Sequence, residues 1–594
     1  MLRTIALAVL VAAACGKSQP APPATGSAGS GSGAISGSGS NVSSFKPEDA
    51  PPKFRTNDSG WNLDPKVTGF GKKFMVASES ELATRAGRDI LAGGGNAVDA
   101  AVATAFALAV VHPSAGNVAG GGFAVIHVKP GDDRALDFRE TAPAGASETM
   151  FLDTAGNPTK GSLVGDRASG VPGTVAGLWE LHRKLGKRPW REVIAPAIAY
   201  ATDGFAVDEK LHGSLVRVSK LLAANPASAA LWMPGGKPRA TGDVVKNPEL
   251  AAVLQRISEH GADGFYQGPT AEAIVAEMTA GKGLISAKDL ADYQAEWRDP
   301  VRYGSFVDMP PPSSGGVVIA MTAEMMGDVS KLPWHSFDHV HRLVEVWRRA
   351  FAARNEMLGD PAYVKDMPVA KMLSKEYAAK LAATIGPKAT PSLPVAPLIE
   401  GDHTTNLCVV DASGMAVALT TTINTAFGNG VTVSGFLLND EMDDFASKPG
   451  TPNVFGLVQG KANRIEPGKR MLSSMAPTIV LDPKGAVVLI AGAGGGPRII
   501  TAVWQTISNV LDFGMPVDRA VAAPRLHHQH LPDEVRLEAE SVSEADAKAL
   551  TDAGYKLTWS GTPREFGAVT AIARTPQGWT GTADPRGGGA AMGD

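Results

Sequence analysis

The spacing of hydrophobic and polar positions changes along the chain from a mainly helical to a mainly strand-like pattern. A short apolar run, FMVAS at 74–78, predicts a strand, and the segment 79–92 that follows has helical spacing. Asn96 precedes an alanine-rich, nearly all-apolar run over 97–111, which predicts a capped helix buried between layers. The run FAVIHV, which follows a glycine loop, predicts the next strand.

From about residue 170 to residue 400 the apolar spacing is mostly helical, with loops at Gly- and Pro-rich points. From Thr404 onward short strands predominate, joined in pairs by turns. The predicted pairs are LCVV with AVALTTTI, APTIVL with AVVLIAGAG, and AVTAIA with WTGTA. Helix-rich and strand-rich stretches in one chain favour sheets packed together with helices outside them.

The N-terminal segment differs in composition from the rest. Residues 1–14 join Arg3 to an apolar run that is too short to cross a bilayer, and they stop directly before Cys15, as in a lipoprotein signal peptide. Residues 15–60 begin with a Gly-, Ser-, Ala- and Pro-rich stretch that predicts a flexible linker. We expect an exported protein of the periplasm or cell envelope with a lipid on Cys15 and a suspected outer-membrane location. Simple secretion after cleavage at the AAA motif is the alternative.

Composition excludes some classes of partner. The chain has 594 residues, with 56 Lys and Arg against 60 Asp and Glu and no basic arm, so nucleic acid is not an expected partner. No later segment is apolar enough for a transmembrane helix, so we expect membrane contact only through the lipid anchor. The two cysteines, Cys15 and Cys408, say little about the redox compartment.

A candidate nucleophile stands where the strand pattern begins. Thr404 precedes a predicted strand, and Thr422 and Asn424 end its partner, so a hairpin would bring these side chains together. A threonine hydroxyl needs an adjacent base, and a free α-amine on the same residue, with a pKa of about 7.7 to 8.0, is such a base. That amine exists only if the chain is cut before Thr404. The alternative is that Thr404 and Thr405 merely begin a strand.

Ordered motifs along most of the chain favour the nucleophile. From about residue 70 to the C-terminus the sequence resembles the γ-glutamyltransferase family of N-terminal nucleophile hydrolases. GGNAVDAAVA, VAGGGF, LDFRETAP, ASGVPGTVAGL and FYQG resemble the family's larger subunit, and TTNLCVVD, NDEMDDF, NVFGLVQGKAN, KRMLSSMAPTIV, GAGGGPRIIT and APRLHHQHLPDE its smaller one. So many matches in order leave little room for coincidence.

The resemblance implies an α/β (α+β) fold, a four-layer αββα sandwich formed jointly by two subunits. It implies that the precursor cuts itself between His403 and Thr404 into a large subunit, 61–403, and a small subunit, 404–594, which stay together as a heterodimer. Thr404 would then transfer the γ-glutamyl group of glutathione or a similar amide to water or to an amino-acid or peptide acceptor. We expect no cofactor and no metal, because the histidine clusters at 335–341 and 527–530 lack supporting ligand spacing.

The resemblance also assigns roles to single residues. Thr422 would hydrogen-bond the Thr404 hydroxyl, and the backbone N–H groups of Gly495 and Gly496, between a predicted strand and helix, would bind the oxyanion. A γ-glutamyl group carries a carboxylate and an ammonium, which need a cation with hydroxyl donors and acidic groups respectively. The residues implied are Arg139, Ser473 and Ser474 for the carboxylate, Glu441 and Asp444 for the ammonium, and Asn424 between them.

Some of these residues also admit simpler interpretations. Arg139 alone predicts a salt bridge to Asp137 or Glu140, and Asp444 alone predicts a solvated turn. The GAGGG run begins like a dinucleotide-binding loop, but Pro497 stands at the third glycine of that pattern and no Gly-Lys-Ser/Thr follows. The combination of residues, in family order, favours the γ-glutamyl site.

Two positions depart from the family pattern in ways that bear on the site. Phe455, in the segment 452–463 that resembles a lid, stands where many relatives have tyrosine, so we expect a lid hydrogen bond to Asn424 to be missing and access to be looser. Cys408 stands where serine is frequent. Strand alternation places it in the interior, where it is expected to pack rather than to act as a nucleophile.

Two other functions are compatible with parts of the sequence. A β-lactam side-chain acylase of the same superfamily shares the self-cleavage and the glycines, but it typically lacks the lid and uses another nucleophile, so Thr404 and residues 452–463 count against it. A catalytically inactive surface lipoprotein with this fold would be favoured by the loss of Thr404, Thr422, Arg139 or the glycine pair. All of these are present.

Overall fold

A computed structural model describes residues 67–329, 331–392, 404–560 and 566–594. The predicted signal peptide at 1–14, the linker at 15–60 with Cys15, and His403 lie outside the described residues. Within the described ranges, no helix has the length and apolar character needed to cross a bilayer.

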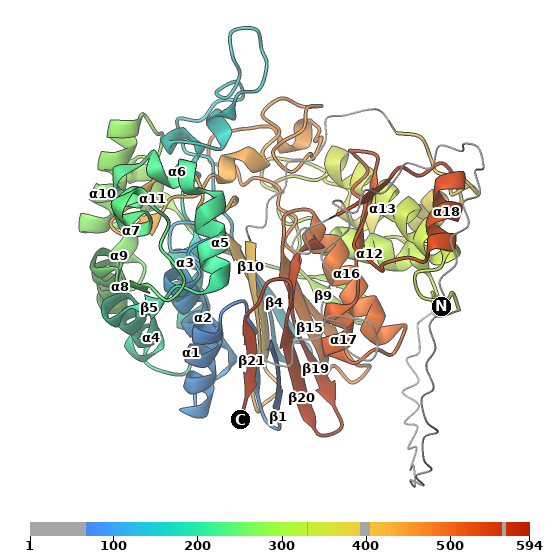
Figure 1. Ribbon diagram of the computed structural model, residues 1–594, viewed down its shortest axis with the longest axis horizontal. Coiled ribbons are helices and arrows are strands. Elements are labelled where there is room, and N and C mark those ends of the chain that lie inside the picture. Colours follow the sequence, from blue (N-terminus) through green and yellow to red (C-terminus); the bar gives the residue numbers. More distant parts are fainter. Residues whose placement is uncertain (1–66, 330, 393–403, 561–565) are drawn as a thin grey trace, which may run out of the picture. The chain divides into compact units, whose positions relative to one another are not determined.

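Two seven-stranded antiparallel sheets form the centre of the fold (Figure 1). Strands from before and after residue 403 are mixed in both of them. The sheet that contains Thr404 has, in spatial order, β21 (Ala590–Gly593), β2 (Met75–Ser78), β10 (Thr404–Val410), β11 (Ala416–Thr422), β3 (Gly121–Lys129), β4 (Asp132–Phe138) and β7 (Glu296–Arg298). The second sheet has β1 (Thr68–Gly71), β20 (Gly578–Ala583), β19 (Ala568–Thr575), β15 (Val487–Gly494), β14 (Thr478–Leu481), β9 (Phe306–Asp308) and β8 (Val301–Tyr303).

Side-chain alternation in β10 explains the layers. Leu407 and Val409 belong to an apolar core shared with the helices α1 (Glu81–Ala92) and α2 (Ala97–Val111). Cys408 and Val410 point the other way and belong to the core that lies between the sheets and continues to α12 (Gly315–Met326), α13 (Phe337–Met357) and α16 (Arg498–Leu511). Helices therefore cover the outer face of each sheet (Figure 1), which confirms the predicted four-layer sandwich.

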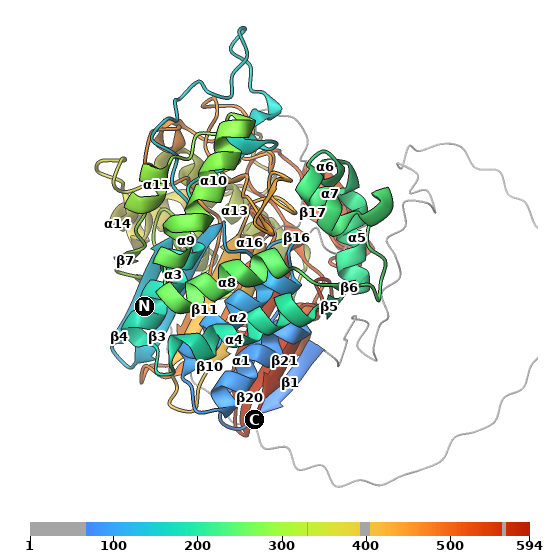
Figure 2. The same ribbon diagram turned by 90° about the vertical axis from the view of Figure 1, so that its left-hand side faces the viewer.

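The remaining elements lie around these four layers, and Figure 2 shows α2, α4 and α8 lying across the strands of the first sheet. The remaining helices are α3 (Thr174–Leu185), α4 (Trp190–Asp203), α5 (Glu209–Arg217), α6 (Ser219–Ala223), α7 (Pro226–Trp232), α8 (Pro248–His260), α9 (Asp263–Tyr266), α10 (Gly268–Gly281), α11 (Ala287–Asp292), α14 (Val369–Met372), α15 (Lys375–Ala382), α17 (Val517–Ala522) and α18 (Glu544–Asp552). Small sheets pair β5 (Phe205–Ala206) with β6 (Val244–Val245), β12 (Thr432–Val433) with β13 (Phe436–Leu437), and β17 (Val535–Leu537) with both β16 (Leu526–His527) and β18 (Leu557–Trp559).

The helix α2 forms as the sequence predicts. Asn96 caps it, since its side chain accepts a hydrogen bond from the N–H of Asp99, and the Asp99 side chain accepts one in return from the Asn96 N–H at 2.9 Å. Every residue of α2 is buried, because the helix lies against α1 and α4 as well as β10 and β11. An alanine-rich, all-apolar sequence suits this position, since small side chains let the layers approach closely.

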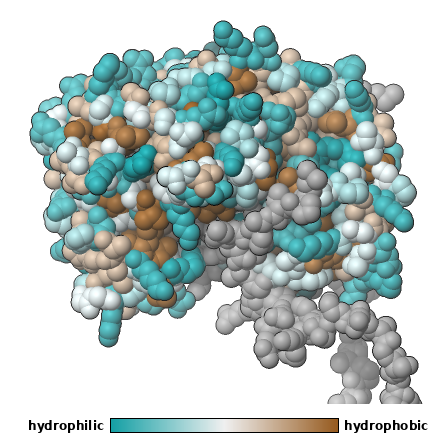
Figure 3. Space-filling model, turned by 90° about the horizontal axis from the view of Figure 1, so that it is seen from above, coloured by the Kyte–Doolittle hydropathy of each residue, from teal (hydrophilic) through white to brown (hydrophobic). Residues whose placement is uncertain are grey.

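The solvent-facing surface is mixed in character. On the face seen in Figure 3, hydrophilic residues predominate and hydrophobic ones form separate small areas. The large hydrophobic side chains that are exposed belong to different segments of the chain: Phe70, Val164, Val216, Val244, Tyr363 and Trp559. Scattered apolar residues of this kind are normal for a globular surface.

Candidate active site

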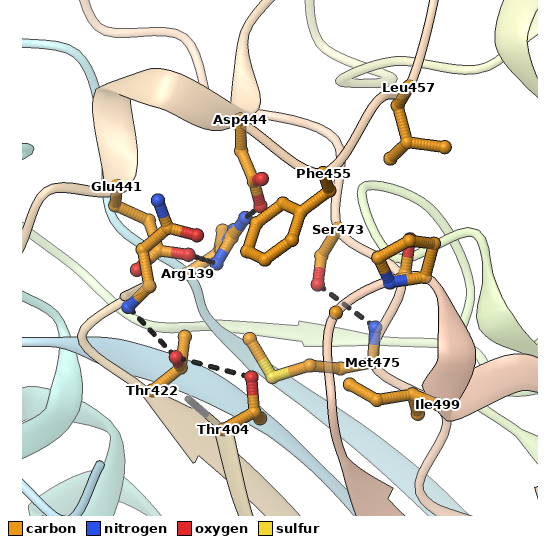
Figure 4. A pocket seen from close by; sticks show the side chains of 14 residues that line it. Arg139, Thr404, Thr422, Glu441, Asp444, Phe455, Leu457, Ser473, Met475 and Ile499 are labelled. Carbon is orange, nitrogen blue, oxygen red and sulfur yellow. Dashed lines mark hydrogen bonds and ion pairs between the residues drawn. The ribbon is translucent and has the colours of Figure 1, made fainter. Parts of the chain in front are cut away.

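The predicted hairpin brings Thr404 to Thr422. The strands β10 and β11 pair antiparallel with Thr404 directly opposite Thr422. The Thr404 hydroxyl donates a hydrogen bond to the Thr422 hydroxyl, with 3.3 Å between the oxygens, and the same Thr422 oxygen accepts the N–H of Asn424 at 2.8 Å (Figure 4). The Asn424 amide donates to the Asp440 carbonyl at 2.9 Å. These contacts fix the side chain of Thr404 at the first residue of its strand.

Two neighbours hold the start of β10 in place. The strand β2 ends at Ser78, and the Glu79 carboxylate beyond it accepts the N–H of Asn406 at 3.3 Å. From the facing sheet, Gly494 lies so close that a Cβ there would be 1.7 Å from the Thr404 carbonyl oxygen. Glycine is therefore required at 494, because any side chain would push the two sheets apart at Thr404.

The glycine pair after β15 turns the chain into α16. Gly495 has φ +126° and Gly496 has φ +57°, conformations that favour glycine. A Cβ at Gly496 would also lie 2.9 Å from the ring of Phe455. Gly496 lines the pocket that contains Thr404, and Gly495 lies just outside that lining. Both lie on the strand-to-helix turn that the sequence predicts. This turn precedes the N-terminus of α16, and a helix N-terminus favours negative charge.

Arg139 is the centre of a buried charge cluster. Its guanidinium forms ion pairs with Glu441 and Asp444 of the short helix η6 (Glu441–Asp444), and Glu140 lies 3.6 Å away. Burial lowers the pKa of Arg139, but the charges of Glu441 and Asp444 outweigh this effect and raise it. Asp137 pairs with Arg298 instead. The simpler salt bridge from Arg139 to Glu140 is therefore present, but the guanidinium pairs more closely with η6, and Asp444 is an ion-pair partner of Arg139 rather than a solvated turn residue.

The carboxyl groups of this cluster have pKa values above their ordinary ones. Burial raises the pKa of Glu441 to about 8, although the Arg139 charge opposes the shift. Burial also raises the pKa of Glu140 well above its usual value, and the nearby charge of Glu441 adds to this effect. Three carboxyl groups thus share the guanidinium of Arg139, and a second cation entering the pocket would be favoured.

Ser473 and Ser474 also line the pocket. The Ser473 hydroxyl oxygen accepts the N–H of Met475 at 3.1 Å (Figure 4). The Ser474 oxygen accepts a hydrogen bond from Arg354 at 3.1 Å. Arg354 lies in the last turn of α13 and is fully buried. The sequence gives no sign of this contact, because a single arginine in a helix with a mixed surface resembles a solvated one.

The segment 452–463 covers the site, as its position in the resemblance suggests. Phe455 and Leu457 line the pocket, and the Phe455 carbonyl accepts a hydrogen bond from Gln529 at 2.9 Å. A phenylalanine ring has no hydroxyl to offer Asn424. Looser access to the site remains a prediction.

Together these residues line one pocket with about 290 Å³ of empty space, which includes open solvent. Nine of the predicted functional residues line it, and Phe455, Leu457, Met475, Pro497 and Ile499 complete the wall. The nine are Arg139, Thr404, Thr422, Asn424, Glu441, Asp444, Ser473, Ser474 and Gly496. The Thr404 hydroxyl, a glycine turn, two serine hydroxyls and an acid–arginine cluster thus line one pocket.

Comparison with known proteins identifies the family. A family model described as gamma-glutamyltranspeptidase matches residues 83–594. The chain belongs to this family. It is 43% identical over 531 residues to the glutathione hydrolase proenzyme of Pseudomonas aeruginosa, covering 87% of this chain and 94% of that protein. It is 45% identical to the glutathione hydrolase proenzyme of Escherichia coli, covering 87% and 90%. The crystal structure of a cephalosporin acylase from Bacillus halodurans aligns with a TM-score of 0.79 at 26% identity, covering 93% and 99%.

Other reactive side chains of this γ-glutamyltranspeptidase family member have structural partners. Burial raises the pKa of the Cys408 thiol to about 12, and the thiol donates to the Thr570 carbonyl at 3.4 Å, so it packs as the sequence predicts. The His527 ring hydrogen-bonds Thr501 and Gln529, and His335 stacks on Trp334 and bonds the Ser541 carbonyl. Among the described residues, no group of three or more His, Cys, Asp or Glu could hold a metal ion.

Proposed function

We propose that this member of the family is a γ-glutamyltransferase and glutathione hydrolase that matures by cutting itself between His403 and Thr404. The observation that carries the proposal is the Thr404 hydroxyl at the floor of the pocket, hydrogen-bonded to Thr422 and facing the acid–arginine cluster. The names of the bacterial relatives support it, since both are glutathione hydrolase proenzymes.

Maturation uses the hydroxyl of Thr404 and water, and the hydroxyl proton passes to the nitrogen of Thr404 as that nitrogen leaves. The oxygen attacks the carbonyl of His403, the peptide C–N bond breaks, and the acyl group moves from nitrogen to oxygen. Water then hydrolyses the ester, which leaves a carboxylate on residue 403 and a free α-amine on Thr404. The large subunit, 61–403, and the small subunit, 404–594, remain paired because both contribute strands to each sheet.

Transfer of the γ-glutamyl group uses the amine made in that step. The amine takes the hydroxyl proton while the oxygen of Thr404 attacks the γ-carbonyl, and N–H groups of Gly495 and Gly496 stabilise the oxyanion. The departing amine receives the proton, and an ester on Thr404 remains. Water then releases glutamate, or the amine of an amino acid or peptide takes the acyl group.

Charge favours a γ-glutamyl donor. The α-carboxylate is placed at Arg139, Ser473 and Ser474, and the α-ammonium at Glu441 and Asp444, with Asn424 between them. Burial raises the pKa of Glu441 and Glu140, and the ammonium of a donor would favour the ionised form of these acids. A β-lactam side chain without an ammonium would not supply this charge.

The acylase alternative has support of its own. The chain is 37% identical to the acylase ACY 1 proenzyme of a Pseudomonas strain over 531 residues, as well as similar to the Bacillus acylase structure. An assay that offers both kinds of substrate separates the two functions. Selective cleavage of a cephalosporin side-chain amide over a γ-glutamyl amide would replace the proposed function.

The test combines intact mass, N-terminal sequencing and release of a chromogenic amine from a γ-glutamyl anilide. We expect two fragments, the smaller beginning at Thr404, and amine release by the wild-type protein. Thr404→Ala should remain one inactive chain, because neither the acyl shift nor the attack can occur without the hydroxyl. An active, two-fragment Thr404→Ala protein would refute the mechanism, and an uncut, inactive wild type would favour the inactive lipoprotein.

Export and anchoring are part of the proposal. The predicted signal at 1–14 and the lipid on Cys15 would place the enzyme in the periplasm or cell envelope, where an outer-membrane anchor fits the Gly16 that follows Cys15. Membrane fractionation of a native host tests this, with Cys15→Ser as the comparison. We expect the wild-type protein in the outer-membrane fraction and the variant in no membrane fraction. A wild-type protein found only in soluble fractions would contradict the anchor.

A further inference from the structure

Arg354 is a buried cation behind the pocket that the mechanism above does not use. Its guanidinium donates hydrogen bonds only to neutral oxygens, those of Ser314 at 3.0 Å, Asn355 at 2.9 Å, Gln459 at 2.9 Å and Ser474 at 3.1 Å. Within the described part of the chain, no carboxylate forms an ion pair with it. Burial lowers the pKa of Arg354 to about 10, although the charge of Asp444 opposes this shift and that of Arg139 adds to it. A buried cation whose hydrogen-bond partners are neutral is costly, so an anion that arrives nearby would be stabilised.

The hydrogen bond to Ser474 determines what that serine can do. A hydroxyl carries one proton, and the Ser474 oxygen already accepts from Arg354 on the side away from the pocket. Its own O–H therefore remains to be donated, and Ser474 lines the pocket. Ser473 is arranged alike, since its oxygen accepts the N–H of Met475. Both serine hydroxyls are thus free to donate a hydrogen bond to an anion. The group that donates to Ser474 is the charged guanidinium of Arg354, whereas Ser473 accepts from a neutral N–H.

Arg354 is also linked to Asp444 through Gln459. The Gln459 oxygen that accepts from Arg354 belongs to the covering segment 452–463, and the amide nitrogen of the same side chain donates to the Asp444 carbonyl at 3.0 Å. Ser474 and Asp444, at the two ends proposed for the carboxylate and the ammonium, are therefore held through one guanidinium.

We propose that Arg354 is a positioning residue for the donor's α-carboxylate. It directs the Ser474 hydroxyl into the pocket, supplies a second positive charge in addition to Arg139, and fixes the covering segment through Gln459. Arg139 is shared with the acids of η6, so the carboxylate depends on this second charge. The inference rests on the proposed γ-glutamyl chemistry and adds to it the group that sets the carboxylate end.

Two anilides that differ only in the carboxylate test this role. The γ-glutamyl anilide has it, and the 4-aminobutyryl anilide lacks it while keeping the amine. We expect Arg354→Lys to be cut normally and to raise KM for the γ-glutamyl anilide about tenfold with little change in kcat, because a point charge cannot keep all four hydrogen bonds. For the 4-aminobutyryl anilide, kcat/KM should change less than about twofold. Arg354→Gln should raise KM for the γ-glutamyl anilide more than Arg354→Lys does.

Arg342→Lys is the matched control. Arg342 lies in the same helix and donates to the carbonyls of Met325 and Met326. Its replacement should change kcat/KM only slightly, and by the same factor for both anilides. An equal loss on both anilides in Arg354→Lys, or no loss on either, would overturn the inference. If neither Arg354 variant folds, Gln459→Ala decides, because it removes one acceptor of Arg354 and must show the same carboxylate-selective rise in KM; a uniform loss there overturns the inference.

The wild-type protein separates this inference from the proposed function. If wild type releases no amine from the γ-glutamyl anilide, the proposed function fails. If wild type is active and the Arg354 variants show no selectivity, only the role of Arg354 fails.

Discussion

At the scale of single residues, the hydroxyl of Thr422 is the contact that the proposed chemistry depends on most directly. It accepts the hydrogen bond of Thr404 and the N–H of Asn424, so it sets the direction in which the nucleophile points. We expect Thr422→Val, which keeps the shape but removes the hydroxyl, to slow both self-cleavage and amine release about tenfold to hundredfold. Gel densitometry over time and steady-state kinetics measure the two rates.

Thr421→Val is the control for that variant. Thr421 is the next residue of β11, and its hydroxyl donates to the Gly121 carbonyl at 2.9 Å, away from the nucleophile. It should lower stability without changing either rate in the folded protein. Equal rates in Thr422→Val and wild type would show that Thr422 does not orient Thr404.

The sequence predicted the pocket-lining residues better than their partners. Motif order is enough to select Thr404, Arg139 and Asp444, because each stands in a run with few alternatives. It cannot predict that Arg139 pairs with the two acids of η6, since that depends on their burial together. Arg354 was not predicted at all, because only the fold brings it to Ser474, 120 residues away.

At the scale of elements, the packing of α1 on α2 depends on Gly87. A Cβ there would lie 2.2 Å from the Thr104 hydroxyl and 3.0 Å from the Ala100 carbonyl oxygen. We expect Gly87→Ala to lower the free energy of unfolding by about 1 to 3 kcal/mol, because the helices must separate. Gly213→Ala in α5, where the new methyl group meets nothing within 4 Å, should raise it by up to about 1 kcal/mol. Urea unfolding measures both, and stabilisation by Gly87→Ala would contradict the close packing.

Long periodic elements were predictable and short edge strands were not. The helix at 97–111 and the strand pairs after Thr404 carry ten or so residues of consistent spacing, and they form as predicted. The strands β7, β8 and β9 have three residues each, too few for an alternating pattern to be recognised. In addition, β8 lies at a sheet edge and pairs with one strand, β9. Tertiary pairing, not local pattern, makes these segments strands.

At the scale of the whole molecule, Glu345 joins the large-subunit part to the small-subunit part through a hydrogen bond from Tyr555. It lies in α13, is buried, and contacts Thr390, Arg349 and the Tyr555 hydroxyl of the small-subunit part. Burial tends to raise the pKa of Glu345, but the hydrogen bonds of Thr390 and Arg349 and the charge of Arg348 outweigh it and lower the pKa to about 2.

This lowered pKa predicts a loss of stability in acid. A carboxyl whose folded pKa lies below its unfolded value stabilises the protein fully above about pH 4.5, and this stabilisation is lost as pH falls toward 2. We expect the free energy of unfolding of the wild type to exceed that of Glu345→Gln by about 3 kcal/mol at pH 7. This difference should be lost by about pH 2. Urea unfolding at pH 7, 4 and 3 measures the difference, and a difference independent of pH would refute the assignment.

The mixing of strands also predicts how the cut protein behaves. Strands on both sides of residue 403 are hydrogen-bonded neighbours, with β10 between β2 and β11 and β20 between β1 and β19. Separating the subunits would expose the edges and apolar faces of both sheets at once, so neither subunit can leave without unfolding. We expect the two fragments to coelute in native size-exclusion chromatography, to separate only in denaturant, and to unfold in one transition, as uncut Thr404→Ala does. Fragments that separate in native buffer would mean that the sheets are not shared in the mature protein.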